Sequence, residues 1–130
     1  RLARHLDRAR KESFSTSELE SWEFDVLSAL RRAGSPYQLS PKALLQQTLV
    51  SSGTMTNRID RLVERGLVHR RTDPDDGRGI LVMMTQKGRE RVDSAISNLL
   101  DAESKLLSRL APADRERLAA LLRKLSLDFD

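Results

Sequence analysis

The sequence predicts a mainly α-helical domain with one small β-hairpin. Two short amphipathic stretches, residues 42–47 and 51–65, are separated by about four residues, which is typical of a helix-turn-helix. Two strand-like apolar runs follow directly, residues 67–71 and 80–84, and they flank a polar loop that contains Gly, Pro and Asp. This pattern predicts a β-hairpin. A helix-turn-helix followed at once by a hairpin is a winged helix, and we expect this module over residues 17–85.

Helix-boundary residues define the first long helix of this module. Ser17 and Glu20 fit a capping box, in which the hydroxyl accepts a hydrogen bond from the third amide and the carboxylate reaches back. We therefore expect the helix to begin at Ser17. Trp22 lies on its apolar stripe and is expected in the core. Gly34 occupies the position of a C-terminal cap, and Pro36 prevents the helix from continuing.

Residues 1–16 and 86–130 predict further helices at the two ends of the chain. Thr85 caps a long helix that is expected to reach about Leu110, and Ala111-Pro112 separates it from a last helix. These two helices carry many leucines: Leu99, Leu100, Leu106, Leu107, Leu110, Leu118, Leu121, Leu122 and Leu125. A small winged helix does not need them for its own core, so we interpret the terminal helices as a homodimer interface. Packing within one chain is the alternative.

The second helix of the helix-turn-helix has two chemically different faces. On a helical wheel, Met55, Ile59, Leu62 and Val63 form an apolar side, whereas Gly53, Thr54, Asn57 and Arg61 lie opposite. An amide can recognise adenine, an arginine can recognise guanine or bind phosphate, and a glycine permits close approach. A merely solvated face would more often carry Glu and Lys. We predict DNA contacts from Ser52, Gly53, Thr54, Thr56, Asn57, Arg61, Arg71 and Arg78.

Basic charge is concentrated in two blocks of the chain, whose net charge is +4. Residues 1–12 and 58–91 each carry a net charge of +3, which indicates a polyanionic partner such as double-stranded DNA. Arg78 lies in the hairpin loop, where it could enter the narrow, electronegative minor groove. Pairing with the neighbouring aspartates is the alternative. Arg70 and Arg71 point to opposite sides of their strand, so only one can face outward.

Several classes of protein are excluded by what the sequence lacks. There is no cysteine, which excludes disulfides, thiolate zinc sites and cysteine nucleophiles. No apolar run approaches the ~20 residues needed to span a bilayer, so we expect a cytoplasmic chain that begins at Arg1 after loss of an upstream segment. His5 and His69 are far apart, and no catalytic motif is present. We therefore predict no enzyme activity, no metal and no cofactor.

Residues 76–88 carry a recognisable motif. The run Asp-Gly-Arg-Gly-Ile-Leu-Val-Met-Met-Thr-Gln-Lys-Gly resembles the signature D-x-R-x-x-x-V-x-L-T-x-x-G of MarR-type transcriptional regulators. The one departure is Met84 in place of Leu, a volume-conserving exchange. The resemblance implies a homodimer that binds a pseudo-palindromic operator, usually as a repressor, and that a small aromatic or phenolic ligand releases from DNA.

Two further segments, residues 22–27 and 52–62, are similar to the urate-responsive branch of that family. In that branch an Asp of the second helix, an Arg of the recognition helix and an Arg of the first wing strand serve the urate site or its coupling to DNA. By position these are Asp25, Arg58 and Arg70. Arg58 lies between the two helix faces, and a half-buried Arg needs an acidic partner or an anionic ligand. The branch also has a Trp on an additional N-terminal helix that these 130 residues lack.

A second class of function remains compatible with the fold. Some winged helices contact proteins rather than DNA, and the terminal helices would then dock a partner. The combination of Gly53, Asn57 and Arg61 with Arg78 suits a phosphate-lined groove better than a protein surface.

Overall fold

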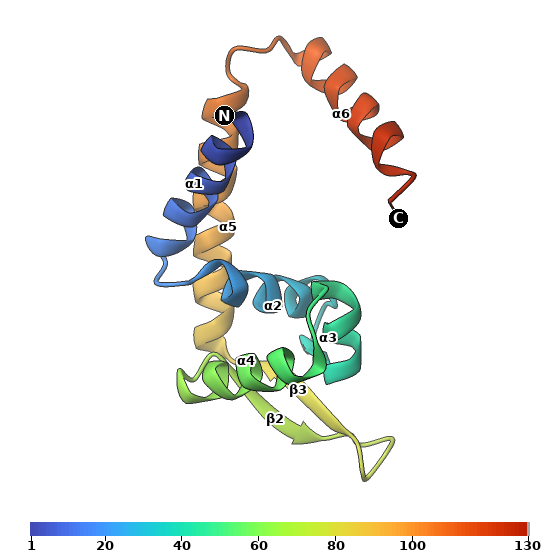
Figure 1. Ribbon diagram of the computed structural model, residues 1–130. Helices are drawn as coiled ribbons and strands as arrows, with labels where there is room; N and C mark the ends of the chain where they lie inside the picture. Colours follow the sequence, from blue (N-terminus) through green and yellow to red (C-terminus); the bar gives the residue numbers. More distant parts are fainter. Residues whose placement is uncertain (130) are drawn as a thin grey trace.

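The computed structural model describes residues 1–129, which form six α-helices and three β-strands. The elements, in chain order, are α1 (Leu2–Ser15), α2 (Ser21–Arg32), β1 (Gln38–Leu39), α3 (Pro41–Thr48), α4 (Ser52–Glu64), β2 (Val68–Thr72), β3 (Ile80–Met84), α5 (Gln86–Leu107) and α6 (Pro112–Ser126). Helices α2, α3 and α4 and the sheet form one lobe, from which α5 extends beside α1 towards α6 (Figure 1). This arrangement confirms the predicted winged helix-turn-helix fold class.

One continuous core holds the lobe together. Its fully buried side chains come from every layer and include Leu30 of α2, Leu44 of α3, Leu62 of α4, Val82 of β3 and Val92 of α5. Helix α1 joins this core through its last turn, where the ring of Phe14 stacks on that of Phe24 with 4.0 Å between centroids. The helix that carries the proposed DNA-contacting face therefore rests on the same core as the base of the long helix α5.

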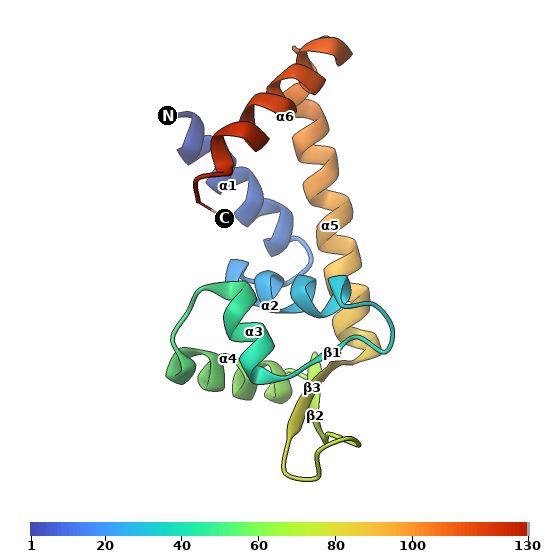
Figure 2. The ribbon, with the colours of Figure 1, turned by 90° about the vertical axis from the view of Figure 1, so that its right-hand side faces the viewer.

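The wing is part of a three-stranded antiparallel sheet in the order β1-β3-β2. Strand β3 pairs with β2 from Val68↔Met84 to Thr72↔Ile80, and its other edge pairs with the short strand β1. The hairpin projects from the helices on the side away from α1 and α6 (Figures 1 and 2). Its loop is thus available to a partner that approaches α4 from the same side.

The predicted start of α2 at Ser17 is wrong. The helix begins at Ser21, and its capping box joins Glu20 to Glu23. The Ser17 hydroxyl instead donates to Ser94 Oγ on α5, at 2.9 Å, and Glu18 adopts a left-handed φ of 58° that an α-helix cannot contain. A tertiary partner on α5 thus competes successfully for the buried Ser17 side chain that the local pattern assigns to the cap. The predicted C-terminal cap at Gly34 is confirmed by its positive φ of 78°.

The terminal helices leave much of their apolar surface uncovered. Within residues 1–129, α6 buries none of its side chains, and Leu118, Leu121, Leu122 and Leu125 are all exposed. Helix α6 diverges from α5 after the connecting loop (Figure 1). Packing within one chain therefore does not account for the leucines of α6. No helix of the described chain is long and apolar enough to cross a bilayer.

Candidate nucleic-acid interface

Helix α4 is held at its N-terminus by Ser51, whose side chain accepts a hydrogen bond from the Thr54 amide at 3.2 Å. Met55, Ile59 and Leu62 are buried against the core, as the helical wheel predicts. The opposite face is exposed and presents every α4 residue predicted to contact DNA: Ser52, Gly53, Thr54, Thr56, Asn57 and Arg61. A Cβ added to Gly53 would meet no atom within 4 Å, so the glycine leaves open space on this face. Amide, hydroxyl and guanidinium groups thus share one solvent-facing surface.

The two arginines of β2 point in different directions, as strand alternation predicts. Arg70 forms an ion pair with Asp60 of α4, whereas Arg71 Nη1 donates to Gln38 Oε1 at 3.4 Å. The guanidinium of Arg71 therefore lies towards β1, and that of Arg70 ties the wing to α4. Both side chains are nevertheless exposed, so the expectation that only one of them faces outward is wrong: β2 is an edge strand, and neither of its faces is covered at these positions.

Aspartate side chains hold the backbone of the wing loop at and before Arg78. The carboxylates of Asp73 and Asp76 accept hydrogen bonds from the backbone amides of Asp75 and Arg78, at 2.9 and 3.1 Å. Among the ion pairs of residues 1–129, none involves the exposed guanidinium of Arg78. Self-pairing with the loop aspartates, the alternative considered for this side chain, is therefore not what the structure shows. A free arginine at the tip of a wing suits an anionic groove.

The three residues assigned by resemblance to a ligand site do not form one cluster of ion pairs. Asp25 is exposed, Arg70 pairs with Asp60, and Arg58 is partly buried with its guanidinium 5.7 Å from the centre of the Trp22 ring. The sequence predicts an acidic partner or an anionic ligand for Arg58, and among the described residues the Trp22 ring lies beside its guanidinium. Such a contact stabilises a cation through the ring quadrupole.

Trp22 is not the core residue that its position on the apolar stripe suggests. It is partly buried at the edge of the core, and its indole nitrogen donates to Glu20 Oε2 at 2.6 Å. An indole N–H needs a polar partner when it leaves water, which favours a position at the core's margin. The Trp22 side chain therefore projects from α2 towards Arg58 of α4, at the edge of the lobe rather than inside it.

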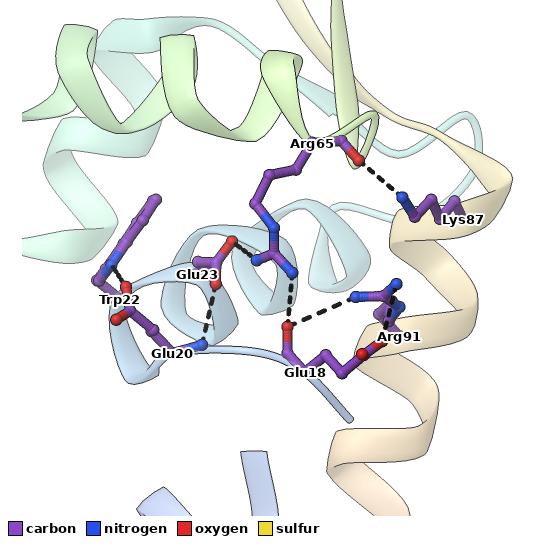
Figure 3. A network of polar contacts seen from close by, with 7 residues as sticks. All are labelled: Glu18, Glu20, Trp22, Glu23, Arg65, Lys87 and Arg91. Carbon is purple, nitrogen blue, oxygen red and sulfur yellow. Dashed lines mark hydrogen bonds and ion pairs between the residues drawn. The ribbon is translucent and has the colours of Figure 1, made fainter. Parts of the chain in front are cut away.

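A network of polar contacts that the sequence pattern does not predict joins α4 to the rest of the chain (Figure 3). Glu23, almost fully buried, forms an ion pair with Arg65, the residue that ends α4. Arg65 Nη2 also donates to the backbone carbonyl of Glu18 at 2.7 Å. Arg91 of α5 pairs with the Glu18 carboxylate at 3.1 Å, and Lys87 donates to the Arg65 carbonyl at 3.0 Å. In the sequence, the one indication of this network is Glu23, a charged residue among the apolar residues of α2.

An open cavity of about 600 Å³ lies beside this network. Its walls include Glu20, Trp22, Arg61, Glu64 and Arg65, so it lies between the α1–α2 connection and α4. Asp25, Arg58 and Arg70 are not among the residues that line it. Within residues 1–129, no group of three or more His, Asp or Glu side chains is arranged to hold a metal ion.

The sheet, the helix-turn-helix and the exposed face of α4 define a winged helix-turn-helix protein. Residues 17–79 match the model of the MarR family. The chain is 31% identical over 122 residues to the transcriptional regulator PecS of Dickeya dadantii, covering 94% of this chain and 74% of PecS. This protein therefore belongs to the MarR family of transcriptional regulators. The relatives are regulators rather than enzymes, which confirms the prediction that the chain is not an enzyme.

Solved structures support the same assignment. Escherichia coli MarR, crystallised as a cysteine variant with operator DNA, superposes with a TM-score of 0.79 at 29% identity, covering 95% of this chain and 86% of that one. Bordetella bronchiseptica BpsR, whose DNA binding is regulated by 6-hydroxynicotinic acid, gives a TM-score of 0.72 at 29% identity, covering 97% and 91%. In a sequence comparison, the match to E. coli MarR spans only 55% of that protein.

Proposed function

We propose that this protein is a homodimeric, ligand-responsive regulator that binds a pseudo-palindromic operator, most simply as a repressor. The observation that carries the proposal is the solvent-facing surface of α4, with Asn57 and Arg61 exposed beside a glycine and opposite a buried apolar side. Such a surface fits the major groove, where an amide can pair with adenine and a guanidinium with guanine. The operator complex of the related E. coli MarR supports the same mode of binding.

The wing complements α4 on the same side of the lobe. Arg78 stands exposed in the loop between β2 and β3, and Arg71 is exposed on β2. With α4 in the major groove, the wing loop would reach the adjacent minor groove, where a free arginine is attracted by the negative potential. The net charge of +4 adds a sequence-independent attraction to phosphates.

The homodimer is supported by the uncovered apolar face of α6. Its exposed leucines, among them Leu121, Leu122 and Leu125, have no partner within the described chain. A second copy would cover them through the helices of residues 1–16 and 86–130, and a two-fold axis would then place two α4 helices on DNA. The half-sites should be about one helical turn, ~34 Å, apart or a multiple of it.

A small aromatic or anionic effector is supported by Arg58. Arg58 projects from the middle of α4 and is partly buried, with its guanidinium against the Trp22 ring. An anion could replace this cation–π contact with a stronger, charge-assisted one. BpsR shows that a relative responds to an aromatic acid. Urate remains the effector that the resemblance favours. Because Arg70 is paired with Asp60, an effector that recruits Arg70 must break that pair.

The DNA-binding proposal is tested with a duplex selected from a randomised pool by the protein itself, hereafter the selected duplex. Fluorescence anisotropy compares it with a scrambled duplex over a salt series. Asn57→Ala or Arg61→Ala should weaken binding to the selected duplex by about 1–3 kcal/mol if these side chains contact bases. Arg31→Met is the control, because Arg31 pairs with Asp93 on an exposed site of α2 and α5. Equal affinity for both duplexes would favour the protein-contact module instead.

The effector proposal has its own readout. Urate, and then a panel of aromatic acids, is titrated into the complex with the selected duplex, and release is followed by anisotropy. Arg58→Ala should lose the response while the mass of the dimer, from analytical ultracentrifugation, is unchanged. An unaltered response of this variant would remove Arg58 from the effector site.

A further inference from the structure

We propose that Arg65 and Glu23 are positioning residues that hold α4 at a fixed angle to α5, and so set operator affinity without touching DNA. The inference rests on the proposed DNA-binding function. It concerns the network of Glu18, Glu23, Arg65, Lys87 and Arg91, hereafter the α4 anchor (Figure 3).

The α4 anchor converges on the residue that ends α4. The Arg65 guanidinium bonds both the Glu23 carboxylate of α2 and, at 2.7 Å, the carbonyl of Glu18 in the α1–α2 connection. The Arg65 carbonyl accepts a hydrogen bond at 3.0 Å from Lys87 in the first turn of α5. One residue therefore binds three different parts of the chain at once. This fixes the C-terminal end of α4 in both position and direction.

Because Glu23 is buried, moving Arg65 away from it raises the free energy of the folded chain steeply. The Glu23 side chain is only 3% exposed, and its other oxygen accepts the Glu20 amide at 3.0 Å. A buried carboxylate that loses its cation is strongly unfavourable. Moving the end of α4 would pull Arg65 from Glu23, so the pair resists displacement more than an exposed pair would. Arg91 of α5 reinforces it by holding the Glu18 carboxylate at 3.1 Å.

The length of α4 converts a small change at the anchor into a large one at the DNA. The helix has 13 residues, which corresponds to ~20 Å. A tilt of ~5° about its C-terminal end would move the N-terminal end by ~1.7 Å, given that length. Hydrogen bonds to bases weaken steeply over such a distance. Asn57 and the residues before it lie towards this moving end, whereas Arg65 lies at the pivot.

The chain offers a matched control for the anchor. Arg31 and Asp93 join α2 to α5 with a 2.6 Å ion pair, but their side chains are 47% and 44% exposed and the pair includes no residue of α4. Arg31→Met and Arg65→Met remove the same charge by the same substitution. Any difference between them therefore reports the position of the pair and not the net charge.

The test measures affinity for the selected and scrambled duplexes, the salt dependence of both, and the melting temperature. Relative to Arg31→Met, Arg65→Met should weaken binding to the selected duplex at least tenfold and leave the scrambled duplex and the salt slope unchanged. Equal weakening of both duplexes, with the slope reduced by about one, would mean that Arg65 contacts phosphate and would overturn the proposal.

A double variant separates positioning from stability. Glu23→Gln with Arg65→Met leaves no buried charge, so its melting temperature should exceed that of Arg65→Met alone. Its affinity for the selected duplex should nevertheless stay low, because α4 still lacks its anchor. Recovery of affinity together with the melting temperature would show a merely structural role and refute the inference.

A milder variant covers the case in which Arg65→Met does not fold. Arg91→Met removes the ion pair with the exposed Glu18 carboxylate and the long 3.5 Å hydrogen bond to the Glu18 carbonyl, but leaves the pair of Arg65 with Glu23. It should weaken binding to the selected duplex two- to fivefold, with partial rescue by Arg91→Lys. Wild-type affinity for Arg91→Met would then overturn the inference. Failure of the wild-type protein to prefer the selected duplex would instead contradict the proposed function, so the two failures are distinguishable.

Discussion

Gly88 provides the sharpest test of the fold, because the structure leaves no space for a side chain there. It is buried in the first turn of α5, beside the start of β2. A Cβ added to Gly88 would overlap the carbonyl oxygen of Leu67 and lie 3.0 Å from its carbon and 3.1 Å from Met84 Cγ. Two of these three atoms belong to the backbone. Gly88→Ala must therefore separate α5 from β2.

The loss of stability expected for Gly88→Ala follows from the contacts that this separation disturbs. Favourable carbon contacts lie near 3.5–4.0 Å and the added Cβ would overlap a backbone oxygen, so the backbones must move apart by ~1 Å or more, an overpacking that typically costs about 1–3 kcal/mol. The 3.1 Å hydrogen bond from the Thr85 amide to the Leu67 carbonyl adds about 1 kcal/mol if it breaks. The higher helix propensity of alanine returns about 1 kcal/mol. We expect a net loss of about 1–3 kcal/mol, or a fall in melting temperature of ~3–12 °C for a chain of this size.

Thermal unfolding followed by circular dichroism measures this effect. Wild type and variant are compared at equal protein concentration, because dimer dissociation makes the melting temperature depend on concentration. Gly53→Ala is the control, since a Cβ at Gly53 meets no atom within 4 Å and the position is helical. This control should melt at the wild-type temperature or slightly higher. A Gly88→Ala variant that is as stable as the wild type would refute the packing argument.

Three further predictions follow from single exposed side chains. Leu49→Gly should raise the free energy of unfolding by about 1 kcal/mol, because Leu49 has a left-handed φ of 54° and a 93% exposed side chain; a lower melting temperature would contradict this. Arg78→Ala should weaken binding to the selected and scrambled duplexes alike and reduce the salt slope by about one if it contacts phosphates in the minor groove; an unchanged slope would place Arg78 away from DNA. Leu122→Glu should shift the protein towards monomer in analytical ultracentrifugation, because a charge would enter the proposed α6 interface, and an undiminished dimer would place that interface elsewhere.

Local sequence patterns predicted the elements whose boundaries depend on neighbouring residues. The start of α4 near residue 51, the C-terminal cap at Gly34 and the pairing of β2 with β3 were all predictable, because helix boundaries, turn chemistry and strand alternation depend on a few neighbouring residues. The same holds for the division of α4 into a buried and an exposed face, which its helical period determines.

Interactions between distant residues were not predictable in this way. The pattern at Ser17 satisfied the rules for a capping box, but the hydroxyl bonds Ser94, 77 residues away in sequence. The partner expected for Arg58 was a carboxylate or an anion, whereas packing brings the Trp22 ring to it. At Ser17 a local capping preference of about 1 kcal/mol is outweighed by a contact that exists only after the chain has folded.

The sequence by itself determined the winged helix class, the face of α4 that meets solvent and the position of Arg78 in the wing loop. Only the tertiary structure decided that Arg65 pairs with Glu23, 42 positions earlier, and that Arg70 pairs with Asp60. The physical reason is that helix and strand periods act between near neighbours, whereas an ion pair depends on the three-dimensional path of the backbone between its partners. The arrangement of α4 relative to α5 is therefore a property of the folded chain.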